Sequence, residues 1–146
     1  MTVAGNMILT DEDAKLVAAA KSVLGRIKLR DDFDAGDVAA AIRTASGNIY
    51  TGICIDLSCG LGFCAEVAAV ADMLKHRETQ IVAVVAMDKH GVLRAPCGRC
   101  RETMFQVDRR NQQCRVLLPG NREALLQDLL PEHWLEDEPP QDYQPL

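Results

Sequence analysis

Cysteine and glutamate residues occur at two places in the chain with spacings that suit a metal site. Cys64 and Glu66 are two positions apart, and Cys97 and Cys100 have the C-x-x-C spacing. Thiolates are favoured ligands of Zn²⁺, and three protein ligands leave a tetrahedral zinc one open position, as is typical of catalytic sites. Cys64, Cys97 and Cys100 are therefore the predicted metal ligands.

Glu66 is the predicted catalytic residue because it follows a predicted ligand by two positions. Zinc lowers the pKa of a water at its open position toward neutrality. Three thiolates supply more negative charge than three imidazoles, so this water needs a nearby proton acceptor. A carboxylate can accept that proton and deliver it to a leaving group.

Helical patterns place both groups at helix N-termini. We expect an alanine-rich helix over 62–76, a buried strand over 81–87 and a helix over 97–108 that begins after Pro96. Because one strand connects the two helices, their N-termini can meet at the same edge of a sheet. Unpaired N–H groups at a helix N-terminus favour the thiolate form of cysteine.

The rest of the chain completes an α/β pattern. The order of elements predicts an α/β fold in which a mixed sheet carries helices on both faces. The region 31–36 is rich in turn-forming residues, and the acidic, Pro-rich segment 137–146 is expected to form a loose tail after one catalytic domain over 1–136. The other expected elements are a helix over 11–28, strands over 38–44 and 48–56 joined by a tight turn, a strand over 115–118 and a helix over 122–130.

Composition restricts the possible partners. The chain has 146 residues, of which 48% are hydrophobic, and a net charge of −5. No apolar run approaches the ~18–20 residues that span a bilayer, and the N-terminus lacks the pattern of a secretory signal. Nucleic-acid binders usually carry a basic surface. We therefore expect a cytoplasmic protein with a small-molecule substrate, and neither a nucleic acid nor a membrane as partner.

Two motifs together resemble the zinc signature of the cytidine deaminase superfamily. Residues 64–66 read Cys-Ala-Glu and residues 96–101 read Pro-Cys-Gly-Arg-Cys-Arg, as in the pattern H-x-E…P-C-x-x-C except for the first ligand. An all-cysteine set is typical of the small family members that act on free nucleosides, including cytidine deaminase and blasticidin-S deaminase. The resemblance covers most of residues 11–135. Further similar segments lie at 38–42, 47–52 and 129–134.

The resemblance implies a three-layer α/β/α fold with a mixed five-stranded sheet, one Zn²⁺ per subunit and a homotetramer. It also implies hydrolytic deamination of cytidine or deoxycytidine to uridine or deoxyuridine with release of ammonia, a reaction of pyrimidine salvage. In the family, backbone groups near the positions of Ala65, Ala95 and Pro96 read the base, so Ala65 and Pro96 are predicted to contact substrate.

The predicted sugar contacts depart from the family pattern. Cys54 and Asp56 stand where family members carry Asn-x-Glu, and a thiol is a weaker hydrogen-bonding group than an amide. The ring-stacking phenylalanine of the family aligns with Gly36, which makes Phe33 the candidate substitute. Because of these departures, the alternative substrate is a modified or antibiotic aminopyrimidine nucleoside, as in blasticidin-S deaminase.

The charge around the predicted zinc site also departs from the family. The arginine that commonly follows the catalytic glutamate is Val67 in this chain, so Arg99 or Arg101 is expected to supply positive charge. Arg99 between the two cysteines is similar to the blasticidin-S deaminase branch.

Structural interpretations of the cysteines remain as alternatives. Cys97 and Cys100 alone would suit a redox dithiol, and Cys54 or Cys59 as a fourth ligand would make a closed structural zinc site without chemistry. Cys114 is expected to be a small buried residue. The sequence leaves the role of Cys59 open.

Overall fold

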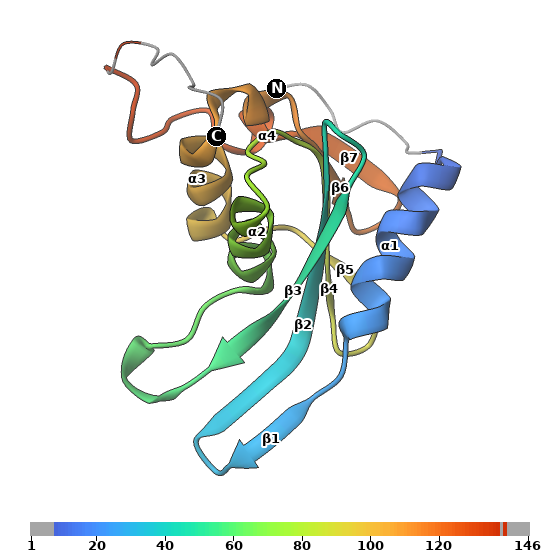
Figure 1. The fold of residues 1–146 in the computed structure, drawn as a ribbon, viewed down its shortest axis with the longest axis vertical. Coiled ribbons are helices and arrows are strands. Elements are labelled where there is room, and N and C mark those ends of the chain that lie inside the picture. The colour runs from blue at the N-terminus through green and yellow to red at the C-terminus, as the bar shows by residue number, and fades with distance from the viewer. Residues whose placement is uncertain (1–7, 138, 140–146) are drawn as a thin grey trace.

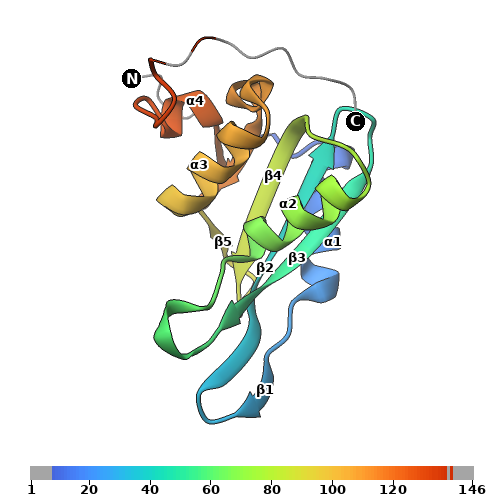
Figure 2. The same cartoon turned by 60° about the vertical axis from the view of Figure 1, so that its left-hand side comes forward.

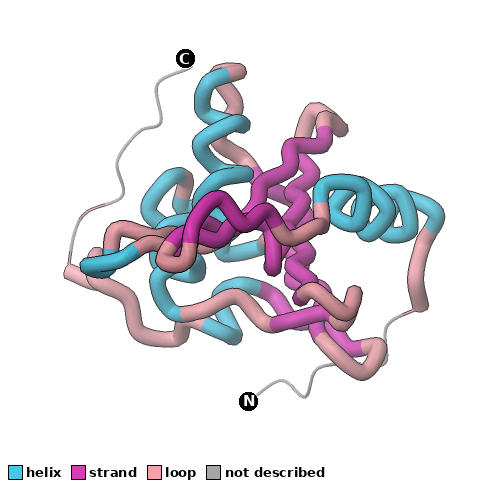
Figure 3. The backbone as a smooth tube through the Cα atoms, turned by 90° about the horizontal axis from the view of Figure 1, so that it is seen from below, coloured by secondary structure: helices cyan, strands magenta, loops and turns pink. Residues whose placement is uncertain are grey.

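The computed structural model describes residues 8–137 and 139. A mixed β-sheet forms its middle layer, with α1 (Asp11–Val23) on one face and α2 (Ala65–Lys75) and α3 (Gly98–Val107) on the other (Figure 1). Figure 2 shows α2 and α3 side by side on their face, and Figure 3 shows the strands between the two sets of helices. The predicted three-layer α/β/α architecture is confirmed.

The main sheet runs through five strands in the order β3-β2-β4-β6-β7. Only β4 and β6 pair in parallel, and the other neighbours are antiparallel, so the predicted mixed five-stranded sheet is also confirmed. Two short strands extend it, β1 beside β2 and β5 beside β4. The strands are β1 (Ile27–Arg30), β2 (Phe33–Thr44), β3 (Ile49–Asp56), β4 (Ile81–Asp88), β5 (Leu93–Arg94), β6 (Arg115–Leu118) and β7 (Arg122–Leu125).

The region 31–36 differs from the expected turn. Only Asp31 and Asp32 form a turn, and β2 begins at Phe33, five residues earlier than expected. The register of β2 against β3 shifts between Ala35 and Ala39, and Gly36 has a φ of +82° within this irregularity. A bulge therefore lets the strand continue through residues that look turn-forming in the sequence.

The helix expected over 122–130 is wrong for its first half. Arg122–Leu125 forms β7, and only Leu126–Leu129 is helical, as the single turn α4. Gly120 and Asn121 both have positive φ, 76° and 54°, and the turn that they form returns the chain antiparallel to β6. Likewise, the first helix ends at Val23 rather than near residue 28.

Two apolar clusters hold the layers together. Leu16 and Ala20 of α1 pack with Val85 and Leu117 on one face of the sheet. The other face forms a larger cluster with α2 and α3, to which Met73, Met104 and Phe105 contribute. Burial on both faces explains the continuous apolar run of β4.

Gly52 of β3 allows α2 to lie close to the sheet. A Cβ at this position would come within 2.3 Å of the Ala65 carbonyl oxygen and 2.4 Å of the Ala69 nitrogen. Only a glycine is compatible with such an approach of helix backbone to strand. Gly52 thereby sets the position of the helix that begins beside Cys64.

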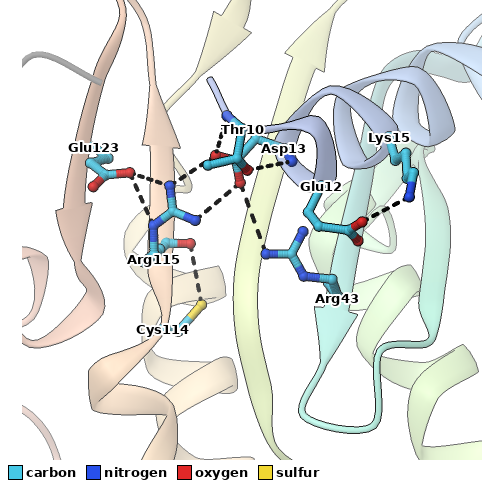
Figure 4. A network of polar contacts seen from close by, with 8 residues as sticks. All are labelled: Thr10, Glu12, Asp13, Lys15, Arg43, Cys114, Arg115 and Glu123. Atoms are coloured by element: carbon cyan, nitrogen blue, oxygen red, sulfur yellow. Dashed lines mark hydrogen bonds and ion pairs between the residues drawn. The ribbon is translucent and has the colours of Figure 1, made fainter. Parts of the chain in front are cut away.

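A polar network fixes α1 to the sheet (Figure 4). Asp13 is fully buried, and its carboxylate accepts two 3.0 Å hydrogen bonds from Arg115 of β6. Thr10 and Asp13 form a capping box at the helix N-terminus, and Glu123 of β7 accepts from Arg115. The network therefore joins α1 to β6 and β7.

No helix within residues 8–137 is long and apolar enough to cross a membrane. Of the predicted tail over 137–146, only residues 137 and 139 belong to the described part, so the expectation of a loose tail lies outside it.

Candidate metal centre and active site

A cleft of about 730 Å³ opens where the N-termini of α2 and α3 meet the ends of β2 and β3. One end of the cleft carries thiols and a glutamate, and the other carries aspartates. Its lining residues include Val38, Cys54, Asp56, Phe63, Cys64, Ala65, Glu66, Ala95, Cys97 and Arg99, together with Asp31, Asp32 and Asp34.

The three predicted metal ligands lie together at this cleft. Cys64 precedes the first residue of α2, Cys97 precedes the first residue of α3, and Cys100 lies in the first turn of α3. The Sγ atoms of Cys64 and Cys97 are 3.5 Å apart, as are those of Cys97 and Cys100, and all three lie within 4.8 Å of one another. The helix starts thus bring together residues that are 33 positions apart in the sequence.

This cluster fits a zinc ion. Zn–S bonds of ~2.3 Å in a tetrahedral site place sulfurs ~3.8 Å apart, which agrees with the observed spacing. Three thiolates at such distances repel one another, and a divalent cation removes that repulsion. Among the described residues, neither Cys54 nor Cys59 joins the group, so the cluster offers three ligands rather than four.

Burial and neighbouring groups give the three thiols different acidities. Burial, and after it the negative charge of Glu66, raises the pKa of Cys100, while burial and the Cys97 thiol raise the pKa of Cys64. Burial also opposes ionisation of Cys97, but hydrogen bonds from the backbone N–H of Cys100 and from the Cys64 thiol outweigh it and lower the pKa of Cys97. The N–H groups at the start of α3 therefore favour one thiolate.

Glu66 lies beside the thiol cluster at the cleft. Its side chain is only 4% exposed, and its Oε2 accepts a 3.4 Å hydrogen bond from Cys100 Sγ. It also lines the cleft, together with Cys64 and Cys97. A carboxylate in this position can exchange protons with a molecule held between the thiols and the cleft.

Cys54 and Asp56 lie on β3 and line the cleft. The Cys54 thiol is buried, its Sγ accepts the backbone N–H of Val38 at 3.2 Å, and it lies 3.7 Å from Asp56 Oδ2. Burial is the main cause that raises the pKa of Cys54, so this thiol stays neutral. Asp56 thus offers the stronger polar contact of the two.

Of the three other predicted substrate contacts, one lines the cleft and two do not. Ala65 lines it. Phe33 and Pro96 are absent from its lining, although Asp32, Asp34, Ala95 and Cys97 beside them contribute.

One aromatic lining residue escaped the sequence analysis. Phe63 lies directly before Cys64, and its backbone pairs with that of Ile55 through two 3.0 Å hydrogen bonds. It is the one aromatic residue among the described residues that line the cleft. Phe63 could have been identified from the sequence because it is adjacent to Cys64, and a residue next to a metal ligand at a helix start must lie near the site.

Arg99 and Arg101, the expected sources of positive charge, lie on α3. Arg99 lines the cleft and donates to the carbonyl oxygen of Gly62 at 3.3 Å. Arg101 does not line the cleft and donates instead to two backbone carbonyls. Of these two arginines, Arg99 is therefore the one placed to act on the cleft.

Comparisons with known proteins agree with this site. No protein-family model matches the chain. A cytidine deaminase of Mycobacterium tuberculosis is 31% identical over 106 residues, which cover 72% of this chain and 77% of the relative.

Solved structures resemble the whole fold. A crystal structure of cytidine deaminase from Mycobacterium tuberculosis matches 86% of this chain and 98% of its own, with a TM-score of 0.71 and 28% identity. A cytidine deaminase from Burkholderia pseudomallei matches 86% of this chain and 100% of its own, with a TM-score of 0.67 and 28% identity. Because a curated relative is 31% identical over most of both chains and the fold agrees with solved structures, the chain belongs to the cytidine deaminase family.

Proposed function

We propose that the protein is a zinc-dependent aminohydrolase that converts cytidine or deoxycytidine to the uracil nucleoside and ammonia. The observation that carries this proposal is the position of Glu66, which is buried against the three-thiol cluster and lines a cleft of about 730 Å³. A structural zinc site has no use for a carboxylate facing a cleft of this size, whereas hydrolytic chemistry requires a proton acceptor there.

Cys64, Cys97 and Cys100 are the residues that would hold the zinc ion. When bound, zinc acts as a Lewis acid that increases the acidity of water. Because the three sulfurs are spaced for tetrahedral binding and no fourth thiol joins them among the described residues, a bound ion would keep one ligand position for water.

Glu66 moves the protons in this proposal. Its carboxylate accepts a proton from the attacking water and delivers it to the ring nitrogen next to the amino-bearing carbon of the base. The same carboxylate then carries the second proton of that water, from the hydroxyl now on this carbon, to the amino group; the C–N bond breaks, ammonia leaves and the oxygen remains as the carbonyl of the uracil base. Burial at the end of the cleft keeps bulk water from competing for these protons.

Substrate binding involves the two halves of the cleft. The ring of Phe63 and the backbone around Ala65 and Ala95 contact the base at the thiol end. Asp56 accepts a hydrogen bond from a sugar hydroxyl at the other end, and the neutral Cys54 thiol packs beside it.

The acidic end of the cleft favours a second candidate, a cationic aminopyrimidine nucleoside. Asp34 and Asp56 are directly opposite each other on β2 and β3, an arrangement in which like charges repel. Arg26 pairs with Asp34 at 2.7 Å, whereas no ion pair of Asp56 is found among the described residues. A positive group on the sugar side of a substrate would relieve the repulsion.

Initial rates on two nucleosides and one nucleotide distinguish these candidates: cytidine, cationic 5′-amino-5′-deoxycytidine and anionic cytidine 5′-monophosphate. Faster turnover of cytidine than of the other two supports pyrimidine salvage. A kcat/KM at least about tenfold higher for the amino compound, equivalent to ~1.4 kcal/mol, supports the cationic candidate, and Asp56→Asn should then remove the preference. Absence of ammonia release from all three by folded, zinc-loaded protein contradicts the proposed function.

We also propose that the protein works as a homo-oligomer, with a tetramer as the specific expectation. Leu57 and Leu61, close to the cleft in the segment before α2, are both exposed, and apolar side chains of this size are commonly covered in assemblies. Light scattering at micromolar concentration tests this, because a monomer contradicts it.

A further inference from the structure

Arg101 connects the metal centre to the C-terminal part of the fold. It directly follows Cys100 on α3, and its guanidinium donates two hydrogen bonds to backbone carbonyls. Nε donates to the carbonyl oxygen of Pro96 at 2.8 Å, and Nη1 donates to that of Leu129 at 2.9 Å. Pro96 directly precedes Cys97, and Leu129 is the last residue of α4.

Neither carbonyl has a partner within its own helix. Pro96 lies two residues before the start of α3, and it is buried away from water. Leu129 ends a helix of a single turn, so no later N–H of that helix can reach its oxygen. A backbone carbonyl that is shielded from water and lacks a partner is costly; Pro96 is buried and Leu129 half-buried, and Arg101 supplies a donor to each.

We propose that Arg101 is a positioning residue for the metal centre: by holding Pro96 against α4, it fixes the orientation of the Cys97 thiol beside Cys64 and Cys100. Arg101 is not among the residues that line the cleft, and its guanidinium contacts backbone carbonyls. It therefore acts through the backbone that carries Cys97. Groups that orient metal ligands in this way commonly contribute about 10- to 100-fold to metal affinity. Lysine cannot replace arginine, because its single nitrogen lacks the two separate edges that reach the two carbonyls.

The inference rests on the proposed zinc site, and its test measures zinc affinity rather than turnover. Competition with a chromophoric chelator gives the Kd for Zn²⁺ of the wild type, Arg101→Gln, Arg101→Lys and Arg122→Gln. Arg122→Gln is the matched control, since Arg122 also donates from Nε to a proline carbonyl, that of Pro119 at 3.1 Å, outside the metal centre. Circular dichroism and thermal unfolding verify that each variant is folded.

We expect the Kd for Zn²⁺ to rise about 10- to 100-fold in Arg101→Gln, to rise also in Arg101→Lys, and to stay unchanged in Arg122→Gln. In the Co²⁺-loaded proteins, the absorption bands that report tetrahedral sulfur coordination should weaken or shift in both Arg101 variants only. If either Arg101 variant has the Kd and the cobalt spectrum of the wild type, the proposal is wrong. Loss of fold in Arg101→Lys would also contradict it, because Arg101 would then stabilise the fold as a whole rather than position the metal ligand. A wild type that binds zinc but releases no ammonia contradicts the proposed function and leaves this inference standing.

Discussion

The Sγ atom of Cys100 lies 3.4 Å from Oε2 of Glu66, and this contact joins the first turns of two helices that are separate in the sequence. Cys100 is fully buried and Glu66 nearly so. The catalytic candidate therefore lies directly against a metal-ligand candidate, close enough to exchange protons with a molecule bound at the metal.

The ligand set of the zinc-loaded protein is predicted to be three sulfurs and one lighter atom. X-ray absorption at the zinc edge measures this set, and Cys64→Ser should lose most of the bound zinc. Cys59→Ser is the matched control, because Cys59 is exposed and does not belong to the thiol cluster. A shell of four sulfurs would show a closed structural site and contradict the catalytic account.

Gly52→Ala should destabilise the fold and weaken zinc binding. Its Cβ would meet backbone atoms of α2 at 2.3 and 2.4 Å, and helix backbone cannot yield as a flexible side chain can. We expect a loss of about 2–3 kcal/mol in the free energy of unfolding and a higher Kd for Zn²⁺, because α2 carries the Cys64 end of the site.

Gly25→Ala provides the control for Gly52→Ala. A Cβ at Gly25 meets no atom within 4 Å. The free energy of unfolding should change by no more than about 0.5 kcal/mol, and the zinc affinity should not change. Equal effects of the two substitutions in urea denaturation would contradict the role assigned to Gly52.

The metal centre could be predicted from the sequence because its chemistry depends on local signals. Each helix start that carries a ligand was recognisable from nearby residues, and the buried strand between them, β4, was recognisable from its apolar run. The contacts of Asp32 and Asp34 with the cleft were harder to predict, because they depend on how β2 extends through the expected turn and pairs with β1 and β3.

Strand pairing also explains the wrong elements. Arg122–Leu125 has a pattern that suits a helix, but the turn at Gly120 and Asn121 directs it back along β6 as an edge strand. The Gly-Asn pair was a hairpin signal in the sequence. The bulge in β2 left no comparable signal, since it depends on the register between Ala35 and Ala39 of β2 and their partners on β3.

Glu78 should make the stability depend on acid pH. Partial burial alone would raise its pKa, but hydrogen bonds from Tyr50, Thr44, Asn48 and Ser46 outweigh this and lower the pKa of Glu78 to about 2. A carboxyl whose folded pKa is depressed stabilises the fold above its unfolded pKa, near 4.5, and loses that contribution as pH falls toward 2.

Urea denaturation between pH 6 and pH 2 tests this effect in the wild type and Glu78→Gln. The difference in free energy of unfolding between them should be largest above about pH 5 and shrink as the pH is lowered. Tyr50→Phe removes one of the hydrogen-bond donors that lower the pKa of Glu78. It should therefore bring the folded pKa of Glu78 closer to its unfolded value and narrow the pH range over which stability changes. A difference that stays constant with pH would contradict the hydrogen-bond account of Glu78.

Asp13→Asn should loosen α1 without changing the chemistry. The substitution leaves Arg115 facing a neutral group in a site where the Asp13 side chain is fully buried. Since Arg115 retains some exposure, we expect a loss of roughly 2–3 kcal/mol in the free energy of unfolding, with unchanged kcat and zinc affinity. Glu12→Gln, which removes an exposed pair with Lys15, should leave stability unchanged, and an equal loss in both variants would count against the network.

The most direct measurement compares ammonia release from cytidine by the wild type and Glu66→Gln, both with their zinc content determined. The account predicts one zinc per chain in both proteins, release by the wild type and a loss of at least about 10²-fold in kcat for the variant. Zinc-loaded Glu66→Gln that releases ammonia at the wild-type rate would contradict the assignment of Glu66 as the group that moves the protons.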